Sequence, residues 1–273
     1  MNNSTLNQLF DHLWRQYISE SPEAEKIHQL FIKQGETVIN DHIAIRTFND
    51  PRVNVEHLAS FFKQLGYEEK GQYDFAKKKL NAKHYEHKDD ANQPKIFISE
   101  LRTEDFSDRL QAYVTALIDQ ISPKLLESIE LLYSGTPWQM PLDYEIYQNL
   151  LSESEYAAWV YAFGFRANHF TVNVNHMQKL NSIEKINELL KMNGYKLNTS
   201  GGEIKGTPTE LLEQSSTLAN QVEVNFKEGA HMIPNSYYEF AKRYENNKGQ
   251  LYQGFIAASA DKIFESTDTK ATK

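Results

Sequence analysis

An internal repeat is the feature that most constrains the fold of this chain. Residues 40–67 (NDHIAIRTFNDPRVNVEHLASFFKQLGY) and residues 167–195 (ANHFTVNVNHMQKLNSIEKINELLKMNGY) show the same order of features. Each segment begins with a histidine in a β-rich run, passes through a turn into an amphipathic helical pattern, and ends at Gly-Tyr. Gly66 and Gly194 fit the position just beyond a helix C-terminus, where glycine is favoured. We therefore expect two copies of one supersecondary unit.

Further strand-like runs follow the Gly-Tyr of each copy and extend the repeat. In the second copy, glycine and proline indicate a loop at 199–209, and the run LLEQSSTLANQVEVNF after it reads as one long strand. The common order is strand, helix and three strands. It predicts an α+β fold in which two βαβββ modules, 35–101 and 166–245, form a curved sheet.

Helical patterns surround the two modules. Residues 4–34 precede the first module, and residues 102–165 lie between the modules as a helical insert. We interpret both segments as elements that cover the sheet, and the insert as a lid or a dimer contact. Residues 1–265 are therefore expected to form a single domain, and residues 266–273 a disordered tail.

The composition limits the chemistry of any active site. The 273 residues include no cysteine, which excludes disulfides, thiolate ligands and a cysteine nucleophile. A metal site must use His, Asp and Glu, which suit Fe(II), Mn(II), Zn(II), Co(II) or Ni(II). The net charge of −8 comes without a long basic block, so we expect no nucleic-acid partner. No apolar run approaches the roughly 20 residues of a membrane span, and no secretory signal opens the chain, so a cytoplasmic location without a membrane partner is the default.

His42 and His169 occupy matching places on the first strand of the two modules. A pseudo-twofold arrangement would bring these strands together, and Glu239, buried in a run of aromatic residues, would need a partner such as a cation. Two histidines and one carboxylate form a metal-binding face with open positions for a substrate and oxygen. Glu100 is the alternative or additional ligand by repeat symmetry. The competing interpretation is that each histidine is a satisfied or half-exposed strand residue.

Arg46 shares a strand face with His42, because alternate side chains of a strand point to one side. Its guanidinium suits a substrate carboxylate bound through two parallel hydrogen bonds. A local ion pair with Asp or Glu is the competing explanation. Other pocket candidates are in phase with the expected ligands, or are polar residues in an otherwise apolar strand. They are Thr171, Ser215, Ser216, Tyr237 and Arg243.

Four motifs of the chain resemble the 2-oxoadipate dioxygenase/decarboxylase family, also called hydroxyglutarate synthases, of the vicinal oxygen chelate superfamily. These motifs are DHIAIRTF, NHFTVNVN, SSTLANQVEVNF and IPNSYYEFAKRY, and they occur in the family's order. The resemblance implies a vicinal oxygen chelate-like fold and a non-haem Fe(II) enzyme. Such an enzyme converts 2-oxoadipate and O2 to 2-hydroxyglutarate and CO2 in lysine breakdown. His42, His169 and Glu239 would be the iron ligands, and Arg46 would hold the substrate carboxylate distal to the 2-oxo acid.

Members of the family with defined activity are longer, so substrate contacts from their additional parts cannot be mapped onto this chain. Three alternatives stay open. A four-ligand site that includes Glu100 and binds Ni(II) or Zn(II) would favour a glyoxalase-like isomerase. The same fold also supports extradiol-type ring-cleaving dioxygenases, or a protein that binds a small acid without turnover. The expected partners are a small 2-oxo acid and O2, and the expected assembly is a monomer or a homodimer.

Overall fold

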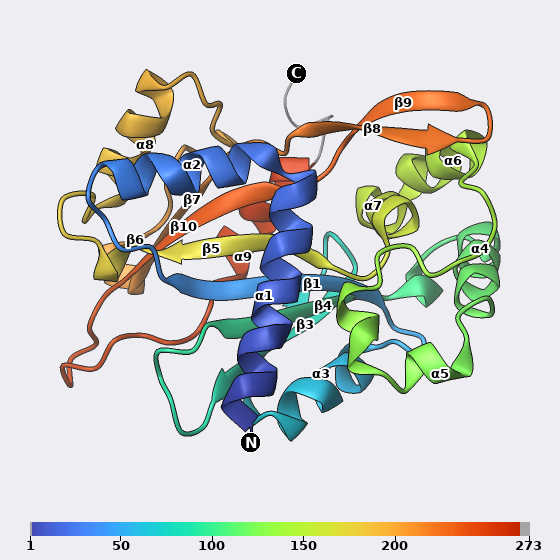
Figure 1. The fold of residues 1–273 in the computed structure, drawn as a ribbon, viewed down its shortest axis with the longest axis horizontal. Helices are drawn as coiled ribbons and strands as arrows, with labels where there is room; N and C mark the ends of the chain where they lie inside the picture. The colour runs from blue at the N-terminus through green and yellow to red at the C-terminus, as the bar shows by residue number, and fades with distance from the viewer. Residues whose placement is uncertain (1, 268–273) are drawn as a thin grey trace.

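The computed structural model describes residues 2–267 and contains a strongly curled eight-stranded sheet (Figure 1). The strands lie in the order β2-β3-β4-β1-β5-β10-β7-β6. Their bounds are β1 (Asn40–Phe48), β2 (Tyr67–Phe75), β3 (Leu80–His87), β4 (Lys95–Leu101), β5 (Ala167–Asn173), β6 (Lys205–Thr207), β7 (Leu212–Ser216) and β10 (Tyr237–Arg243).

The predicted βαβββ repeat is confirmed by the strand pairing. In the first module β1 pairs in parallel with β4, and in the second β5 pairs in parallel with β10. The modules meet where β1 and β5 pair antiparallel, which relates them by a pseudo-twofold axis. Helices α3 (Val55–Gln64) and α8 (Ile183–Met192) follow the first strand of each module. As predicted, each helix is followed by a left-handed glycine, Gly66 at φ +99° and Gly194 at φ +82°.

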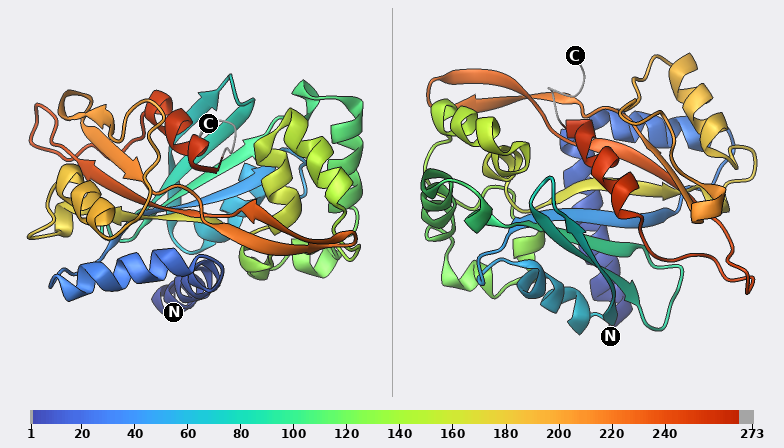
Figure 2. Two further views of the ribbon diagram at one scale, coloured as in Figure 1. Left: turned by 90° about the horizontal axis from the view of Figure 1, so that it is seen from above. Right: turned by 180° about the vertical axis from the view of Figure 1, so that it is seen from behind.

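Helices cover the two faces of the sheet unequally (Figure 2). The N-terminal helices α1 (Asn2–Glu20) and α2 (Pro22–Lys33) lie against the convex face. On the concave face, α9 (Ala257–Phe264) contacts β2 at one edge of the sheet and β6 and β7 at the other. The predicted insert is helical and lies at one end of the sheet. It contains α4 (Asp108–Ile118), α5 (Pro123–Leu126), α6 (Tyr144–Glu153) and α7 (Glu155–Phe163), with short 3-10 turns η1 (Thr103–Asp105) and η2 (Ile129–Tyr133).

Apolar residues on one side of the central strands hold this arrangement in place. Ile43 and Ile45 of β1 are fully buried, and Phe170 of β5 meets the Trp14 ring of α1 edge-on. Phe240 of β10 meets Phe31 of α2 in the same way. Each such side chain contributes roughly 1.5–3 kcal/mol when buried. Because side chains alternate along a strand, the intervening residues of β1, β5 and β10 must face the concave side.

The prediction of one long strand in LLEQSSTLANQVEVNF is wrong. Strand β7 ends at Ser216, and β8 (Gln221–Phe226) pairs with β9 (Gly229–Pro234) in a separate two-stranded sheet. Asn220 marks the point where the chain leaves the curled sheet and returns to it. Its backbone N–H donates to the carbonyl of Ser236, and its carbonyl accepts from the N–H of Asn235. The hairpin therefore extends from the module like a loop, toward α6 (Figure 1).

The prediction of a disordered tail from residue 266 is also wrong for its first two residues. Glu265–Thr267 form the 3-10 turn η5, in which Ser266 and Thr267 are buried. Buried partners explain this order, because the Ser266 hydroxyl lies 2.9 Å from that of Ser216. The rest of the predicted tail, 268–273, lies outside the described residues. Among the helices that the structure describes, none combines the length and apolar character needed to cross a membrane.

Candidate metal centre

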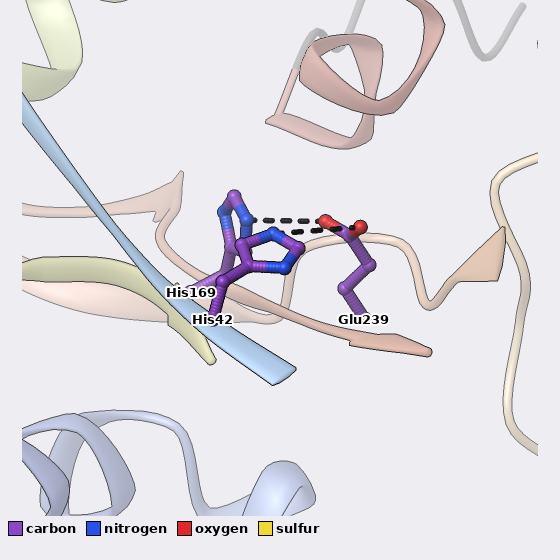
Figure 3. A group of neighbouring side chains, drawn as sticks. All are labelled: His42, His169 and Glu239. Atoms are coloured by element: carbon purple, nitrogen blue, oxygen red, sulfur yellow. Dashed lines mark ion pairs between the residues drawn. The ribbon is translucent and has the colours of Figure 1, made fainter. Parts of the chain in front are cut away.

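Three side chains that can ligate a metal converge on the concave face of the sheet (Figure 3). They are His42 of β1, His169 of β5 and Glu239 of β10, and their ligating atoms all lie within 4.8 Å of one another. Oε2 of Glu239 lies 3.1 Å from Nε2 of His169, and Oε1 lies 3.7 Å from Nε2 of His42. All three side chains are buried. Two imidazole nitrogens and one carboxylate oxygen are the donor set of a 2-His-1-carboxylate metal site.

Strand register brings these three residues together. In the antiparallel pair of β1 and β5, His42 lies opposite Thr171, and His169 lies opposite Ala44. In the parallel pair of β5 and β10, Glu239 also lies opposite Thr171. Thr171 therefore stands between a histidine and the carboxylate, with its hydroxyl 3.0 Å from Nε2 of His42. The structure places this pocket candidate directly beside the cluster.

Each histidine is oriented by the residue that precedes it in the chain. Nδ1 of His42 lies 2.8 Å from Oδ1 of Asp41, and Nδ1 of His169 lies 3.0 Å from Oδ1 of Asn168. A donor hydrogen on Nδ1 leaves Nε2 of each ring free to ligate a metal. The sequence signal for this support is the polar residue before each histidine, in DH and NH, which sequence reasoning did not use.

Arg243 supports the cluster from behind instead of facing a substrate. Its Nε and Nη2 donate to the two carboxylate oxygens of Asp41 at 2.7 and 2.8 Å, and Nη1 donates to the carbonyls of Tyr252 and Gly254. The guanidinium holds the pKa of the buried Asp41 carboxyl well below its usual value, although burial alone would raise it. Arg243 is buried and its guanidinium is directed to Asp41 and two backbone carbonyls, so the pocket interpretation does not describe it.

The electrostatics of the cluster favour the ligating forms of Glu239 and His169. Burial opposes the charge of Glu239, but the neighbouring His42 and His169 outweigh burial, and the pKa of the carboxyl is lowered. Burial lowers the pKa of His169, which favours the neutral ring. Gln214 of β7 donates from Nε2 to Oε1 of Glu239 at 2.6 Å. An ionised carboxylate and neutral imidazoles are the states that bind a metal.

One buried polar atom beside the cluster lacks a partner. Within residues 2–267, Oε1 of Gln214 makes no hydrogen bond, although Gln214 lines the cavity next to His42, His169 and Glu239. Buried polar groups are normally paired, so this atom fits a site that holds a further polar group when loaded. Sequence reasoning missed Gln214. The sequence pattern that could have identified Gln214 is its position two residues before Ser216, which puts both side chains on one face of β7.

Glu100 does not belong to the cluster. Its Oε2 accepts the backbone N–H of Val55 at the start of α3, on the convex face. The strand register shows which residue is the true equivalent of Glu239. In the second module, the residue opposite His169 is Tyr237, and Glu239 follows it by two. In the first module, the residue opposite His42 is Lys95, and Phe97 follows it by two. The residue equivalent to Glu239 in the first module is therefore Phe97, whose ring lines the cavity.

Arg46 is buried on the concave face of β1, as the strand phase predicts. Nη1 donates to Oε1 of Glu155 and Nη2 to Oγ1 of Thr267, both at 2.9 Å. The guanidinium carbon also lies 4.9 and 5.1 Å from the ring centres of Tyr156 and Trp159. The local ion pair therefore exists. Nε has no hydrogen-bond partner among residues 2–267, which leaves a buried donor for another acceptor.

The remaining pocket candidates divide between the two faces of the sheet. Tyr237 stacks on His169 with ring centres 4.5 Å apart, and its buried hydroxyl has no partner in the described part of the chain. Ser216 lies opposite Glu239 on the concave side and contacts Ser266. Ser215 points the other way and donates to Asn187 of α8, so it lies outside the site.

The cavity over the cluster is small and mostly apolar. Its volume is about 20 Å³, and the C-terminal segment supplies Phe255, Ala260, Ile263 and Phe264 to its wall. Sequence reasoning missed these residues, because no local pattern shows where a C-terminal helix will be placed.

Comparisons with known proteins agree on one family. A family model described as 2-oxoadipate dioxygenase/decarboxylase matches residues 3–250. A chloroplastic/amyloplastic 2-oxoadipate dioxygenase/decarboxylase of Oryza sativa subsp. japonica is 33% identical, over 97% of this chain and 79% of its own length. That relative is longer, as expected for the family.

Solved structures extend the agreement to three dimensions. The hydroxyglutarate synthase of Oryza sativa, crystallised in complex with 2-oxoadipate, has a TM-score of 0.91 at 32% identity and covers 99% of this chain and 94% of its own. A Shewanella frigidimarina protein, provisionally described as a hydrolase, has a TM-score of 0.86 at 52% identity, over 92% of this chain and 97% of its own. A Ralstonia eutropha protein provisionally assigned to the glyoxalase superfamily, at 22% identity, has a TM-score of 0.76 over 91% of this chain and 85% of its own, which confirms the vicinal oxygen chelate-like fold.

Proposed function

Because the chain belongs to the 2-oxoadipate dioxygenase/decarboxylase family, we propose that it is an Fe(II)-dependent enzyme that acts on a 2-oxo dicarboxylic acid. The proposed reaction converts 2-oxoadipate and O2 to 2-hydroxyglutarate and CO2. One atom of O2 enters the carboxylate that replaces the keto group, and the other enters the new hydroxyl. The observation that carries the proposal is the buried group of His42, His169 and Glu239, with Arg46 on the same face of β1.

The metal would be held by His42, His169 and Glu239, since these residues supply the donors that a non-haem iron site uses. Bound Fe(II) would supply redox chemistry with O2 and a template for a 2-oxo acid. Zn, Ni, Mn and Co suit the same donors, so another divalent ion can occupy the site in a purified sample.

Arg46 would bind and orient the far end of the substrate. It lies four residues from His42 along β1, roughly 13 Å from Cα to Cα at the usual rise of a strand. Both residues belong to the concave face of β1, so a dicarboxylic acid with one end at the cluster would extend toward Arg46. The buried Nε–H of Arg46 is available to a carboxylate while Nη1 keeps its pair with Glu155.

The walls of the site would exclude water and hold the substrate. The rings of Phe97, Phe255 and Phe264 surround the cavity, and a dry site strengthens the interaction of Arg46 with a carboxylate. The hydroxyls of Thr171, beside His42, and of Tyr237, which has no partner within residues 2–267, would hydrogen-bond the bound acid.

The position of Glu100 counts against the glyoxalase-like alternative. That alternative was tied to a fourth carboxylate ligand, and Phe97 stands where repeat symmetry would put it. Hydrolysis and simple binding of an acid are distinguished by experiment, since neither consumes O2.

Anaerobic reconstitution with Fe(II), followed by oxygen-electrode traces, tests the function. We expect O2 uptake with 2-oxoadipate, slower uptake with shorter and longer 2-oxo acids, and a hydroxy acid with one carbon fewer as the product. His169→Ala is the control and should lose both metal and uptake. A wild-type protein that holds metal stoichiometrically, yet consumes no O2 with any 2-oxo acid, would refute the proposal.

A further inference from the structure

The cavity over His42, His169 and Glu239 is too small for the substrate proposed above. Its volume of about 20 Å³ is that of roughly one water molecule. A dicarboxylic 2-oxo acid is several times larger. The structure described here is therefore a closed form, and some element of the wall must move before a 2-oxo acid can bind.

The C-terminal segment Phe255–Thr267 supplies the wall that can move. The Phe255 ring packs edge-on against His42, with ring centres 4.8 Å apart, and Phe264 lies against Phe97 and Phe75 of the sheet. The other walls are strands of the curled sheet, and each is fixed by ladders of backbone hydrogen bonds on both sides. The C-terminal segment has no strand pairing of its own, since it consists of α9 and the turn η5.

Hydrogen bonds outside any strand ladder hold this segment. Nδ2 of Asn198 donates to the carbonyl of Lys262 and to the Ser266 hydroxyl, and the N–H of Ala219 donates to the carbonyl of Ser266. At the first end, the N–H of Phe255 donates to the hydroxyl of Tyr73 at 3.0 Å. At the second end, the Ser266 hydroxyl contacts Ser216, and the Thr267 hydroxyl accepts from Nη2 of Arg46. Such bonds contribute roughly 0.5–1.5 kcal/mol each, and none of them is part of a strand ladder, so the segment can open without unfolding the sheet.

Thr267 also lines a second, larger pocket. That pocket has a volume of about 180 Å³, and Thr267 and Glu155, the two hydrogen-bond partners of Arg46, are among its lining residues. If the turn η5 moved away from Arg46, this pocket would connect with the cavity, and the guanidinium of Arg46 would be exposed. The route from solvent to the cluster would then pass Arg46 first.

We propose that Phe255–Thr267 is a lid that opens to admit the substrate, and that Arg46 is its latch. In the closed form Nη2 of Arg46 binds Thr267, and in the loaded form the distal carboxylate of the substrate competes for the same guanidinium. Substrate binding is thereby coupled to release of the C-terminal turn. The inference rests on the proposed function, because it requires a 2-oxo dicarboxylic acid as the ligand.

A reversible disulfide across the lid tests the proposal. The hydroxyl oxygens of Ser216 and Ser266 are 2.9 Å apart, a spacing that two cysteine sulfurs can bridge with little adjustment, and the chain has no other cysteine. In S216C/S266C loaded with Mn(II), we expect oxidation to weaken 2-oxoadipate binding at least roughly 100-fold, because a locked lid leaves no open population. Reduction should restore binding. In each single variant, S216C or S266C, treatment with the same oxidant should leave the affinity for 2-oxoadipate at its value before oxidation.

The outcomes separate the lid from the function. Equal 2-oxoadipate affinity of the oxidised and reduced double variant would overturn the lid. Absence of 2-oxoadipate binding to both the reduced variant and the wild type would instead overturn the proposed function. Amide exchange of the wild type provides a second test that needs no variant. We expect the amides of α9 to exchange much faster than those of β5, and equally slow exchange of both would also overturn the lid.

Discussion

Asp41→Asn tests whether the paired charges behind His42 hold the cluster together. Asp41 is fully enclosed, orients Nδ1 of His42, and receives two hydrogen bonds from Arg243 at 2.7 and 2.8 Å. An amide in its place leaves the buried guanidinium without a counter-charge. Breaking a buried pair costs about 3–5 kcal/mol. Arg243 keeps its bonds to the carbonyls of Tyr252 and Gly254, so we expect the lower end, about 3 kcal/mol.

Two measurements separate the structural from the metal-binding part of this effect. Thermal unfolding of the metal-free protein should show a melting temperature lowered by roughly 6–12 °C, given about 2–4 °C per kcal/mol at this size. A chelator competition should show that affinity for Fe(II) or Mn(II) falls roughly 10- to 100-fold, the usual effect of losing a partner that orients a ligating histidine.

Matched variants make the test specific. Asn168→Ala removes only a neutral hydrogen bond to His169, so it should cost about 1 kcal/mol. The double variant D41N/R243M removes both buried charges, and it should be more stable than Asp41→Asn alone because no charge is left unpaired. Wild-type stability together with wild-type metal affinity in Asp41→Asn would refute the reasoning.

Four further predictions follow from the site. Arg46→Ala should raise KM for 2-oxoadipate by roughly 10- to 100-fold and hardly change KM for a monocarboxylic 2-oxo acid. It should also uncouple O2 uptake from hydroxylation. Unchanged steady-state kinetics would contradict the binding of the distal carboxylate by Arg46. Glu100→Gln should keep full metal content by elemental analysis and cost about 1 kcal/mol of stability in urea, because Glu100 caps the N–H of Val55; loss of metal would return it to the ligand set. Gln214→Leu should weaken metal binding by up to about tenfold, read by chelator competition, whereas an unaltered affinity would show that its bond to Glu239 positions nothing. The depressed pKa of Asp41 gives a stabilisation that is fully present above the unfolded pKa of the carboxyl, near 4, and that is lost as the pH falls toward the folded pKa. The stability of the wild type should therefore fall more steeply with acid than that of Asp41→Asn. Parallel acid-unfolding curves would argue against this contribution.

The repeat could be recognised in the sequence because each module has its own local pattern of strand, helix and helix-ending glycine. His42, His169 and the phase of Arg46 could be predicted for the same reason, since each depends on position within one strand. Glu239 could be selected because a glutamate among aromatic residues is unusual. The error at Glu100 arose because register is set by pairing between strands, which one sequence does not display, and a shift of one residue reverses the face.

The C-terminal segment could not be predicted from local pattern at all. The placement of Phe255 against His42 and of Thr267 against Arg46 depends on contacts between residues more than two hundred positions apart. The β8–β9 hairpin is a similar case, because its alternating residues suit any sheet, and only the turn at Asn220 removes it from the main one. The interaction of Asp41 with Arg243 is equally distant in sequence.

Phe97, at the position equivalent to Glu239, makes the two modules unequal at the candidate metal centre. Two equal modules would offer two carboxylates and enclose an ion from both sides. With a benzyl ring at the equivalent of Glu239, the carboxylate comes from the second module alone, and the first module contributes His42 beside the apolar ring of Phe97. Under the proposed function, a substrate would therefore meet an asymmetric site, with a carboxylate on one side, Phe97 on the other, and Arg46 further along β1. Such an asymmetric site would present one face of the prochiral carbon of the acid, so we expect the product of the proposed reaction to be a single enantiomer.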